Sequence, residues 1–408
     1  MLDERISSAA EISDPRERAL ARSIVMVSLR RLGTIRMALA KFLDKGLPKK
    51  VPALEWILVT GAAQILFLEV GDHAAVDLAV HACKQDRATA PFAPLANAVL
   101  RNIARQKQEL LTAPEPFADT PQWLSVRWQK HYGLENAVAM AAMHAREPTL
   151  DLTVRSDPET WAKKLGGIVL PNGSVRLTTH APVIELDGYS EGAWWVQDVS
   201  ASLPARLLNV QPGELVADLC AAPGGKTMQM ALAGAQVVAL DKSAERMKRL
   251  AANLGRMGLS AQARIGDVLT FTGGPFDAIL LDAPCTSTGT IRRHPDAAWT
   301  KRASHIATLA ALQAKMLERA AALLKPGGRL VYCTCSLEPE EGEQQIALFL
   351  RRAPDMRRRP VEPGELPGLE TCIDNNGDIR PLPHFLAHSE SRLSGMDGFF
   401  MARLERVG

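Results

Sequence analysis

Two cysteines stand at similar places in the second half of this sequence. Cys285 follows the run ILLDAP and Cys335 follows the run RLVYCT, and both runs are apolar in the way that buried strands are. A cysteine at the end of such a strand can meet a ligand, and its thiolate is a strong nucleophile. The pair predicts thiol chemistry at the edge of a sheet. The alternative for each cysteine is a small, buried hydrophobic residue.

The other four cysteines predict neither a metal centre nor a disulfide framework. Cys83, Cys220, Cys333 and Cys372 form no CxxC pair, and the histidines do not fall at zinc-finger spacing. Cys333 lies two residues before the end of its strand, so we expect it to point into the core. We therefore expect no metal at the site.

A turn with two adjacent glycines follows an earlier strand, in ADLCAAPGGKT at 217–227. Gly224 and Gly225 allow the backbone to pass close to a ligand, and the free N–H groups of the following helix favour a polar or negative group. Asp241 ends the next strand, where a carboxylate can accept hydrogen bonds from both hydroxyls of a ribose. Asp267 ends the strand after that. The arrangement predicts a nucleoside pocket.

A P-loop ATPase is the main alternative for this turn. GGKT resembles the end of a Walker A motif, and AILLD at 278–282 resembles Walker B. Walker A requires a glycine five residues before Gly225, and that position is Cys220. We therefore do not expect Lys226 to clamp a triphosphate.

The hydrophobic pattern divides the 408 residues into three parts. Residues 1–145 space their apolar residues three and four apart, which predicts an all-α domain. Residues 146–205 combine short strands with a helix, which is typical of a small α+β module. Residues 206–408 alternate strands and helices, which predicts an α/β domain whose parallel sheet binds ligands beyond the carboxyl ends of its strands.

Basic residues gather at separate places, although the net charge is only +3. Residues 1–50 contain eleven Lys or Arg against six Asp or Glu, and residues 351–359 contain five arginines. Arg101 and Arg105 are four residues apart, on one face of a predicted helix. Such patches suit nucleic acid, but each can also be a solvated surface, and the sequence leaves both interpretations open.

The composition argues against a membrane protein. The start, MLDERISSAAEISDPRER, is too charged for a secretory signal peptide. The longest apolar stretch, at 54–70, contains Glu55, Gln64 and Glu69, which a membrane-spanning helix rarely carries. We expect this stretch to be a core helix of a cytoplasmic protein.

Together these motifs resemble a known family, the S-adenosylmethionine-dependent RNA cytosine-5 methyltransferases of the NOL/NOP/Sun type. The bacterial Sun/RsmB branch is most similar: its NusB-like N-terminal domain would match residues 1–145, as an RNA-binding domain, and its ending resembles GMDGFFMARL at 395–404. The resemblance implies a Rossmann-like catalytic domain over residues 206–408. The motifs that carry it are ADLCAAPGGKT, Asp241, Gly266-Asp267, DAPCTSTGTIRRHPD at 282–296 and YCTCSLEPEE at 332–341.

The reaction of this family explains two cysteines. Cytosine C5 is too weak a nucleophile to take a methyl group from a sulfonium, so a thiolate must first add to C6. After transfer, the C5 proton and the thiolate must leave. The resemblance assigns the attack to Cys335 and assistance in release to Cys285. Chemistry alone leaves these roles exchangeable, because DNA cytosine methyltransferases use a Pro-Cys cysteine like that of Pro284-Cys285.

The resemblance also assigns binding residues. Asp282, which ends its strand beside Cys285, would serve both the methionine part of the cofactor and the cytosine amino group. Arg292, Arg293 and His294 follow on a loop and would hold RNA phosphates, unless that loop is only solvated. The predicted cofactor-binding residues are Cys220, Ala221, Ala222, Pro223, Gly224, Gly225, Lys226, Asp241, Asp267 and Asp282.

A helix is expected to begin near Pro339. Its N-terminus would favour the thiolate of Cys335. Nearby glutamates would oppose the thiolate and are most simply first-turn residues of that helix; they are Glu338, Glu340, Glu341 and Glu343.

The resemblance implies small-subunit ribosomal RNA as the substrate, and we expect a monomer. Two other functions remain to be weighed: a non-catalytic RNA-binding or assembly factor that kept the fold, and a methyltransferase acting on an exocyclic nitrogen. The two strand-end cysteines and Asp282 are all present, which disfavours the first. Amine methylation needs no nucleophilic thiol, which disfavours the second.

Overall fold

The computed structural model describes residues 14–48, 50–112, 115–179 and 181–408. The chain divides into two compact units, one of residues 1–146 with 291–300, and one of residues 147–290 with 301–408. The predicted absence of a signal peptide, and part of the N-terminal basic charge, concern residues 1–13 and lie outside the described residues.

The first unit is built of helices, as its pattern predicts. The apolar stretch at 54–70 lies mostly in α4, whose Leu58, Val59 and Ala62 are fully buried. The segment 291–300 belongs to this unit: the indole N–H of Trp299 donates a hydrogen bond to the carbonyl of Leu29 at 2.8 Å. Its α-helices are α2 (Pro15–Arg30), α3 (Leu32–Ala40), α4 (Pro52–Phe67), α5 (Asp72–Gln85), α6 (Ala93–Arg105), α7 (Lys107–Leu111), α8 (Gln122–His144) and α13 (Asp296–Thr300).

The second unit begins with a small antiparallel sheet of order β2-β3-β1-β4. Its buried ion pair joins Arg176 to Asp151 at 2.7 Å. The segment VIEL at 183–186 has a pattern that predicts one of the short strands of this module, but Val183–Glu185 form a 3-10 turn. The elements are β1 (Asp151–Val154), α9 (Pro158–Leu165), β2 (Gly167–Val169), β3 (Val175–Leu177) and β4 (Trp194–Val196).

The same unit contains a seven-stranded sheet of order β10-β11-β9-β8-β5-β6-β7. The strands from β7 to β9 pair in parallel, and β11 and β10 add antiparallel pairs at one side. The predicted α/β class is confirmed. The strands are β5 (Leu215–Leu219), β6 (Gln236–Asp241), β7 (Gln262–Ile265), β8 (Phe276–Asp282), β9 (Leu324–Thr334), β10 (Met356–Arg358) and β11 (Phe400–Arg406).

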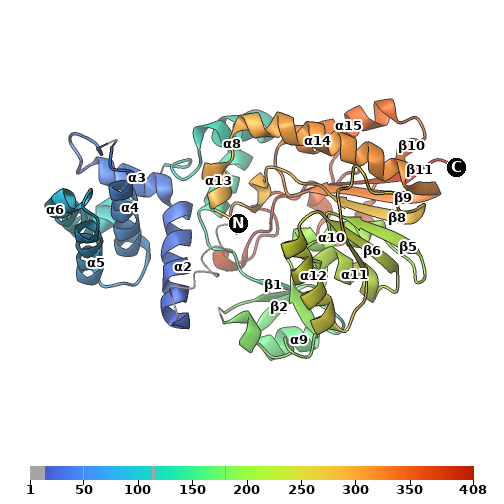
Figure 1. Cartoon of the computed structure of the whole chain (residues 1–408), viewed down its shortest axis with the longest axis horizontal. Helices are drawn as coiled ribbons and strands as arrows, with labels where there is room; N and C mark the ends of the chain where they lie inside the picture. Colours follow the sequence, from blue (N-terminus) through green and yellow to red (C-terminus); the bar gives the residue numbers. More distant parts are fainter. Residues whose placement is uncertain (1–13, 49, 113–114, 180) are drawn as a thin grey trace. The chain divides into compact units, whose positions relative to one another are not determined.

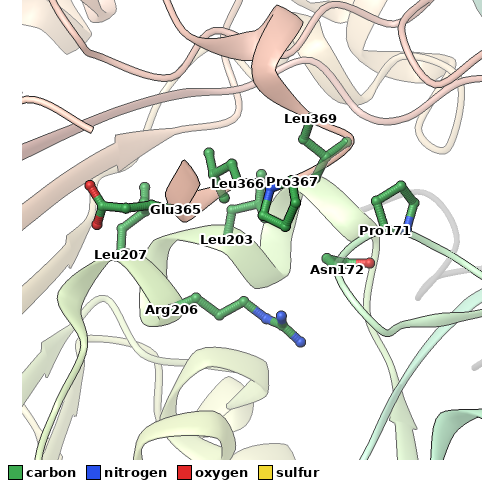
Figure 2. A pocket seen from close by; sticks show the side chains of 9 residues that line it. All are labelled: Pro171, Asn172, Leu203, Arg206, Leu207, Glu365, Leu366, Pro367 and Leu369. Atoms are coloured by element: carbon green, nitrogen blue, oxygen red, sulfur yellow. The ribbon is translucent and has the colours of Figure 1, made fainter. Parts of the chain in front are cut away.

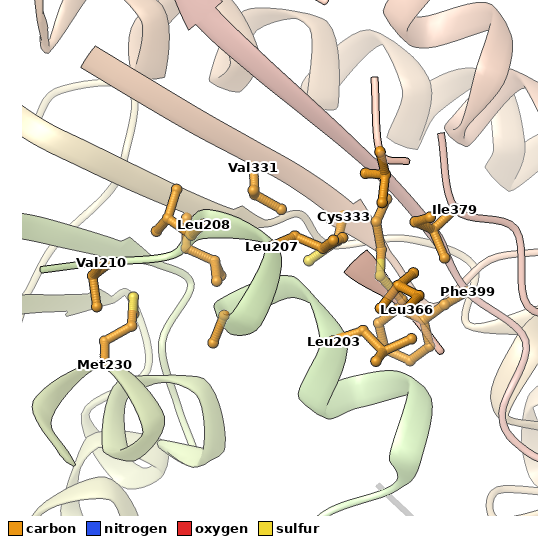
Figure 3. Close-up of a cluster of buried hydrophobic side chains, with 14 of the residues drawn as sticks. Leu203, Leu207, Leu208, Val210, Met230, Val331, Cys333, Leu366, Ile379 and Phe399 are labelled. Carbon is orange, nitrogen blue, oxygen red and sulfur yellow. The ribbon is translucent and has the colours of Figure 1, made fainter. Parts of the chain in front are cut away.

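Helices cover both faces of this sheet (Figure 1). Alternate residues of β8 point to opposite faces: Leu280 packs in the cluster that contains Leu203 of α10, whereas Ile279 packs in the cluster that contains Leu317 of α14. Figure 3 shows the first cluster, with Cys333 between the sheet and α10, in the core as predicted. The helices are α10 (Val199–Leu208), α11 (Gly225–Leu232), α12 (Ala244–Met257), α14 (Ala303–Ala322) and α15 (Glu343–Arg352).

The second unit contains a pocket beside α10. A pocket of about 230 Å³ lies between α10 and the segment 365–369, with the Arg206 side chain along its wall (Figure 2). None of the described residues that line it is a site residue predicted from the sequence.

Within the described part of the chain, no helix is long and apolar enough to cross a membrane.

Candidate active site

The carboxyl ends of β8 and β9 bring Cys285 and Cys335 together. Their Sγ atoms lie 3.4 Å apart, within hydrogen-bond distance for sulfur. Cys335 is half-buried and Cys285 is buried. The hydroxyl of Ser287 lies 3.5 Å from the Cys335 sulfur. The two thiols predicted from the sequence therefore form one site.

The surroundings of the two thiols shift their pKa values in opposite directions. A hydrogen bond from the Cys285 thiol, together with Ser287 and the charge of Lys226, lowers the pKa of Cys335 in spite of its burial. The same hydrogen bond, burial and the charge of Glu341 raise the pKa of Cys285. The pKa of Cys335 therefore lies below that of Cys285, so Cys335 is the thiol of the pair that ionises more readily.

A lysine and an aspartate stand beside the thiols. Lys226 Nζ donates to Asp282 Oδ2 at 2.7 Å, and it lies 5.5 Å from the ring centroid of Phe399. Burial disfavours the charge of Lys226, but Asp282 outweighs it, so the pKa of Lys226 is raised. The Cys333 thiol, at the base of this group, donates to Asp282 Oδ1 at 3.6 Å. Lys226 is therefore a cation beside the two thiols.

The glycine turn has the backbone that a close ligand contact requires. Gly224 has a φ of 108°, a conformation that side chains rarely adopt, and it precedes the first residue of α11. Cys220 also has a positive φ, 70°, and burial raises the pKa of its thiol, so it contributes backbone rather than a reactive sulfur. Ala221 and Ala222 are buried and Pro223 is exposed.

Asp241 is the last residue of β6, and its contact with a ribose stays a prediction. Its carboxylate is buried and accepts hydrogen bonds from the backbone N–H groups of Ala222, at 3.2 Å, and Ser243, at 2.9 Å. Arg246 pairs with it at 3.2 Å. Asp267, in contrast, is exposed, and its carboxylate accepts from the N–H of Leu269.

A buried carboxyl group supports a cofactor beside the turn. Asp218, at the end of β5, accepts from the Thr227 hydroxyl through Oδ2 at 2.5 Å, while Oδ1 is buried without a partner among the described residues. Burial raises the pKa of Asp218 to about 7. A buried oxygen without a hydrogen bond is costly, and a polar group of a bound ligand would relieve that cost. These residues fit a nucleoside-bearing cofactor.

The helix expected near Pro339 begins later. Residues Pro339–Glu341 form a 3-10 turn, and α15 begins at Glu343. The prediction that Glu341 is a first-turn residue of the helix is therefore wrong: its side chain is fully buried and points into the site. Glu343 pairs with Arg380 at 2.7 Å. The Gly342 that separates the turn from α15 was the sequence signal that could have shown this.

The predicted RNA residues lie in the first unit. Arg292 is only 1% exposed, and its carbonyl accepts from Arg30 Nη2 at 3.0 Å. This corrects the prediction for Arg292, because a guanidinium so enclosed presents no surface to a phosphate. Arg293 and His294 are half-buried, and their RNA contacts stay predictions.

The helix α6 presents the other predicted RNA residues. Arg101 and Arg105 are both exposed, and Arg101 Nε donates to Asn97 Oδ1 at 3.0 Å on the same helix. Their exposure is compatible with either an RNA contact or a solvated face, so this call also stays a prediction.

Two family models match the chain. The model of the 16S rRNA methyltransferase RsmB/F matches residues 205–405, and the model of the NusB family matches residues 1–105. These matches confirm the NusB-like domain and the methyltransferase domain that the sequence predicts.

Individual relatives agree with these models. The ribosomal RNA small subunit methyltransferase B of Klebsiella pneumoniae is 37% identical over 88% of this chain and 89% of its own. The fold of the crystal structure of PH0851 covers 97% of this chain and 91% of its own, with a TM-score of 0.74 and 24% identity. NSun6 from Pyrococcus horikoshii, solved with SFG, has a TM-score of 0.60 and 21% identity over 71% of this chain and 98% of its own.

Proposed function

Because this chain belongs to the RsmB/F family of 16S rRNA methyltransferases, we propose that it methylates C5 of a cytosine in 16S ribosomal RNA through a covalent bond between Cys335 and C6. The observation that carries the proposal is the pair of thiols 3.4 Å apart at the ends of β8 and β9. A methyltransferase that acts on a nitrogen or an oxygen has no use for such a pair.

The first step is attack of the Cys335 thiolate on C6, which moves an electron pair toward C5. The contact with Cys285 supports this role, since it lowers the pKa of Cys335, and the Cys335 sulfur is only half-buried. The cation of Lys226 stabilises the thiolate before the attack. C5 then becomes nucleophilic enough to accept a methyl group.

The last step is elimination. A solvent water molecule takes the C5 proton, the electron pair of that C–H bond re-forms the C5–C6 double bond, and the bond between C6 and sulfur breaks to return the Cys335 thiolate. Cys285, in contact with that sulfur, assists this release. Asp282 faces the same space and can accept a hydrogen bond from the cytosine amino group, which would hold the base in place.

The methyl donor of this family is S-adenosyl-L-methionine. When bound, it supplies an electrophilic methyl group on a sulfonium. Asp241 would accept hydrogen bonds from the ribose hydroxyls, and the backbone around Gly224 would lie against the methionine part. The unpaired oxygen of Asp218 supports a polar ligand beside that turn.

Methyl transfer to purified 16S ribosomal RNA, mapped by bisulfite sequencing, tests the proposal. Methylation at C5 protects a cytosine from deamination by bisulfite, so a single protected site should appear in treated RNA and vanish in RNA from a strain that lacks the gene. Labelled methyl groups on a purine or on a ribose oxygen would contradict the proposal. Since ribosomal RNA is the proposed substrate, we propose a cytoplasmic location.

A further inference from the structure

Glu341 is a buried carboxylate that is bound by neutral donors. Its side chain is 0% exposed, and among the described residues no lysine or arginine lies within ion-pair distance of it. Burying an ionised carboxylate without a counter-ion is costly unless several hydrogen bonds support it. So costly an arrangement needs a physical reason.

The donors to Glu341 come from the two loops that carry the thiols. The backbone N–H of Thr286, the residue after Cys285, donates at 3.0 Å, and the Thr286 hydroxyl also donates. The hydroxyl of Ser336, the residue after Cys335, donates at 2.6 Å. One carboxylate therefore joins the residue that follows each thiol.

The helix α14 completes this arrangement. Gln313 Nε2 donates both to Glu341 Oε1, at 3.0 Å, and to the carbonyl of Pro284, at 2.9 Å. The carbonyl of Glu341 in turn accepts from the hydroxyl of Tyr332, in β9, at 2.9 Å. Glu341 is thus fixed to the rigid helix and strand that flank the site.

Both oxygens of the carboxylate accept and neither carries a hydrogen, so it meets all of these donors at once. A glutamine keeps only one such oxygen, and its NH₂ group would require the Thr286 and Ser336 hydroxyls to reverse and accept, or would face the Thr286 N–H. The negative charge of Glu341 also raises the pKa of Cys285.

We propose that Glu341 is a positioning residue for the reaction: it holds the Cys285 and Cys335 loops together so that the two thiols remain in contact. The inference rests on the proposed function for its catalytic meaning, but the geometry that it predicts can be measured without RNA. The residue touches neither sulfur and acts through Thr286 and Ser336.

The first measurement is the rate at which dibromobimane bridges Cys285 and Cys335 in the full-length protein. This reagent fluoresces only after both of its arms have reacted, and peptide mapping identifies the two cysteines. The Glu341→Gln variant should bridge at least about tenfold more slowly than the wild type. Glu318→Gln removes a charge from the exposed face of α14 and should bridge at the wild-type rate.

The second measurement separates positioning from general damage to the fold. In Glu341→Gln, kcat for methyl transfer should fall at least about tenfold, while KM for RNA and Kd for S-adenosylmethionine stay within about twofold of wild type. Glu341→Asp, which keeps the charge on a shorter side chain, should recover part of both the bridging rate and kcat. Equal bridging and equal kcat in Glu341→Gln and wild type would overturn the proposal.

If Glu341→Gln does not fold, Ser336→Ala and Thr286→Val remove one donor each and decide the question. Slower bridging in both supports the proposal, and wild-type bridging in both overturns it. A wild-type protein that methylates no C5 but whose bridging depends on Glu341 would remove the proposed function and leave the positioning role standing.

Discussion

Gly289 and Gly398 meet backbone to backbone next to the active site. The N–H of Gly398 donates to the carbonyl of Gly289 at 2.8 Å, while the N–H of Gly289 donates to the carbonyl of Cys335 at 3.0 Å. A Cβ atom on Gly289 would lie 1.9 Å from the carbonyl oxygen of Gly398. The loop after Cys285 thus packs directly on the segment that carries Phe399, and only glycine fits between them.

Gly289→Ala should therefore disturb the site. The two backbones must move apart, which shifts the loop that bears Cys285, so kcat for methyl transfer should fall at least tenfold in a steady-state assay. Gly255→Ala is the matched control, because that glycine lies in α12 with nothing within 4 Å of an added Cβ. It should keep full activity and stabilise the protein by about 0.5–1 kcal/mol. Equal activity of the two variants would contradict the close packing.

Asp241→Ala should weaken cofactor binding. Loss of a carboxylate that accepts from ribose hydroxyls removes charge-assisted hydrogen bonds, so isothermal titration should show Kd for S-adenosylmethionine raised by at least about tenfold. Asp267→Ala should have a smaller effect, because Asp267 is exposed. Tight ATP binding by the wild type, with no response to S-adenosylmethionine, would instead support the P-loop interpretation.

The elements that carry the site could largely be predicted from the sequence. The apolar runs LVADL, QVVALD and FDAILLD predict strands, and they form β5, β6 and β8. The runs are short, and those of β6 and β8 end in Asp, which marks the end of the strand. Parallel strands end at the same edge of a sheet. The apolar runs before Cys285 and Cys335 were therefore enough to predict that the two cysteines lie close together.

What could not be predicted depends on tertiary packing. Nothing local distinguishes a glutamate that turns inward, as Glu341 does, from one that complements a helix terminus, because both occur in the same acidic run. Arg292 is similar: an Arg-Arg-His run on a loop suggests an exposed cationic surface, but the segment 291–300 packs into the first unit. The strand predicted at VIEL failed because three apolar residues are too few to choose between a strand and a 3-10 turn.

The buried imidazole of His144 should make folding stability fall in acid. Burial lowers the pKa of His144 to about 3, with the charge of Arg292 adding to the effect, and neither ring nitrogen has a partner among the described residues. Between pH 6.5 and about pH 3, His144 is protonated in the unfolded chain but neutral in the folded chain. The contribution of His144 to stability is therefore full above pH 6.5 and falls by about 1.4 kcal/mol per pH unit toward pH 3, while the raised pKa of Asp218 acts in the opposite sense between about pH 7 and its ordinary value of 3.8.

The urea midpoint of unfolding, followed against pH, measures this slope. His144→Phe keeps an aromatic contact with Trp128, whose ring centroid lies 5.2 Å away, and between about pH 6 and pH 4 it should remove about 1.4 kcal/mol per pH unit from the slope of stability against pH. His73→Gln, at the exposed start of α5, should leave the slope unchanged. A slope in His144→Phe equal to that of the wild type would contradict the role of His144.

The exposed arginines of α6 should contribute to RNA affinity through phosphate contacts. If Arg101 and Arg105 each neutralise one phosphate, the double variant with glutamine at both positions should bind RNA more weakly, and its slope of log K against log salt should shrink by about 1.4. Lys84→Gln, on the exposed surface of α5, is the control and should leave the slope unchanged. An unchanged slope in the double variant would mean that these arginines form a solvated face.

The last prediction separates the two thiols. If Cys335 attacks C6, Cys335→Ala should abolish methyl transfer and form no covalent adduct with RNA, because no other described nucleophile is placed to activate C5. If Cys285 acts in elimination, Cys285→Ala should still attack and transfer but release poorly. A complex of protein and RNA that survives a denaturing gel should then accumulate. The lowered pKa of Cys335 and the raised pKa of Cys285 favour this assignment.

The double substitution of both thiols is the control, and it should give no adduct, because the adduct requires Cys335. The reverse pattern, with adduct in Cys335→Ala and none in Cys285→Ala, would exchange the two roles, as in the enzymes that attack through a Pro-Cys cysteine. Activity retained in both single variants, with adduct in neither, would exclude thiol catalysis. The contact of 3.4 Å between the sulfurs would then be a packing contact, and the charge of Lys226 would need another explanation.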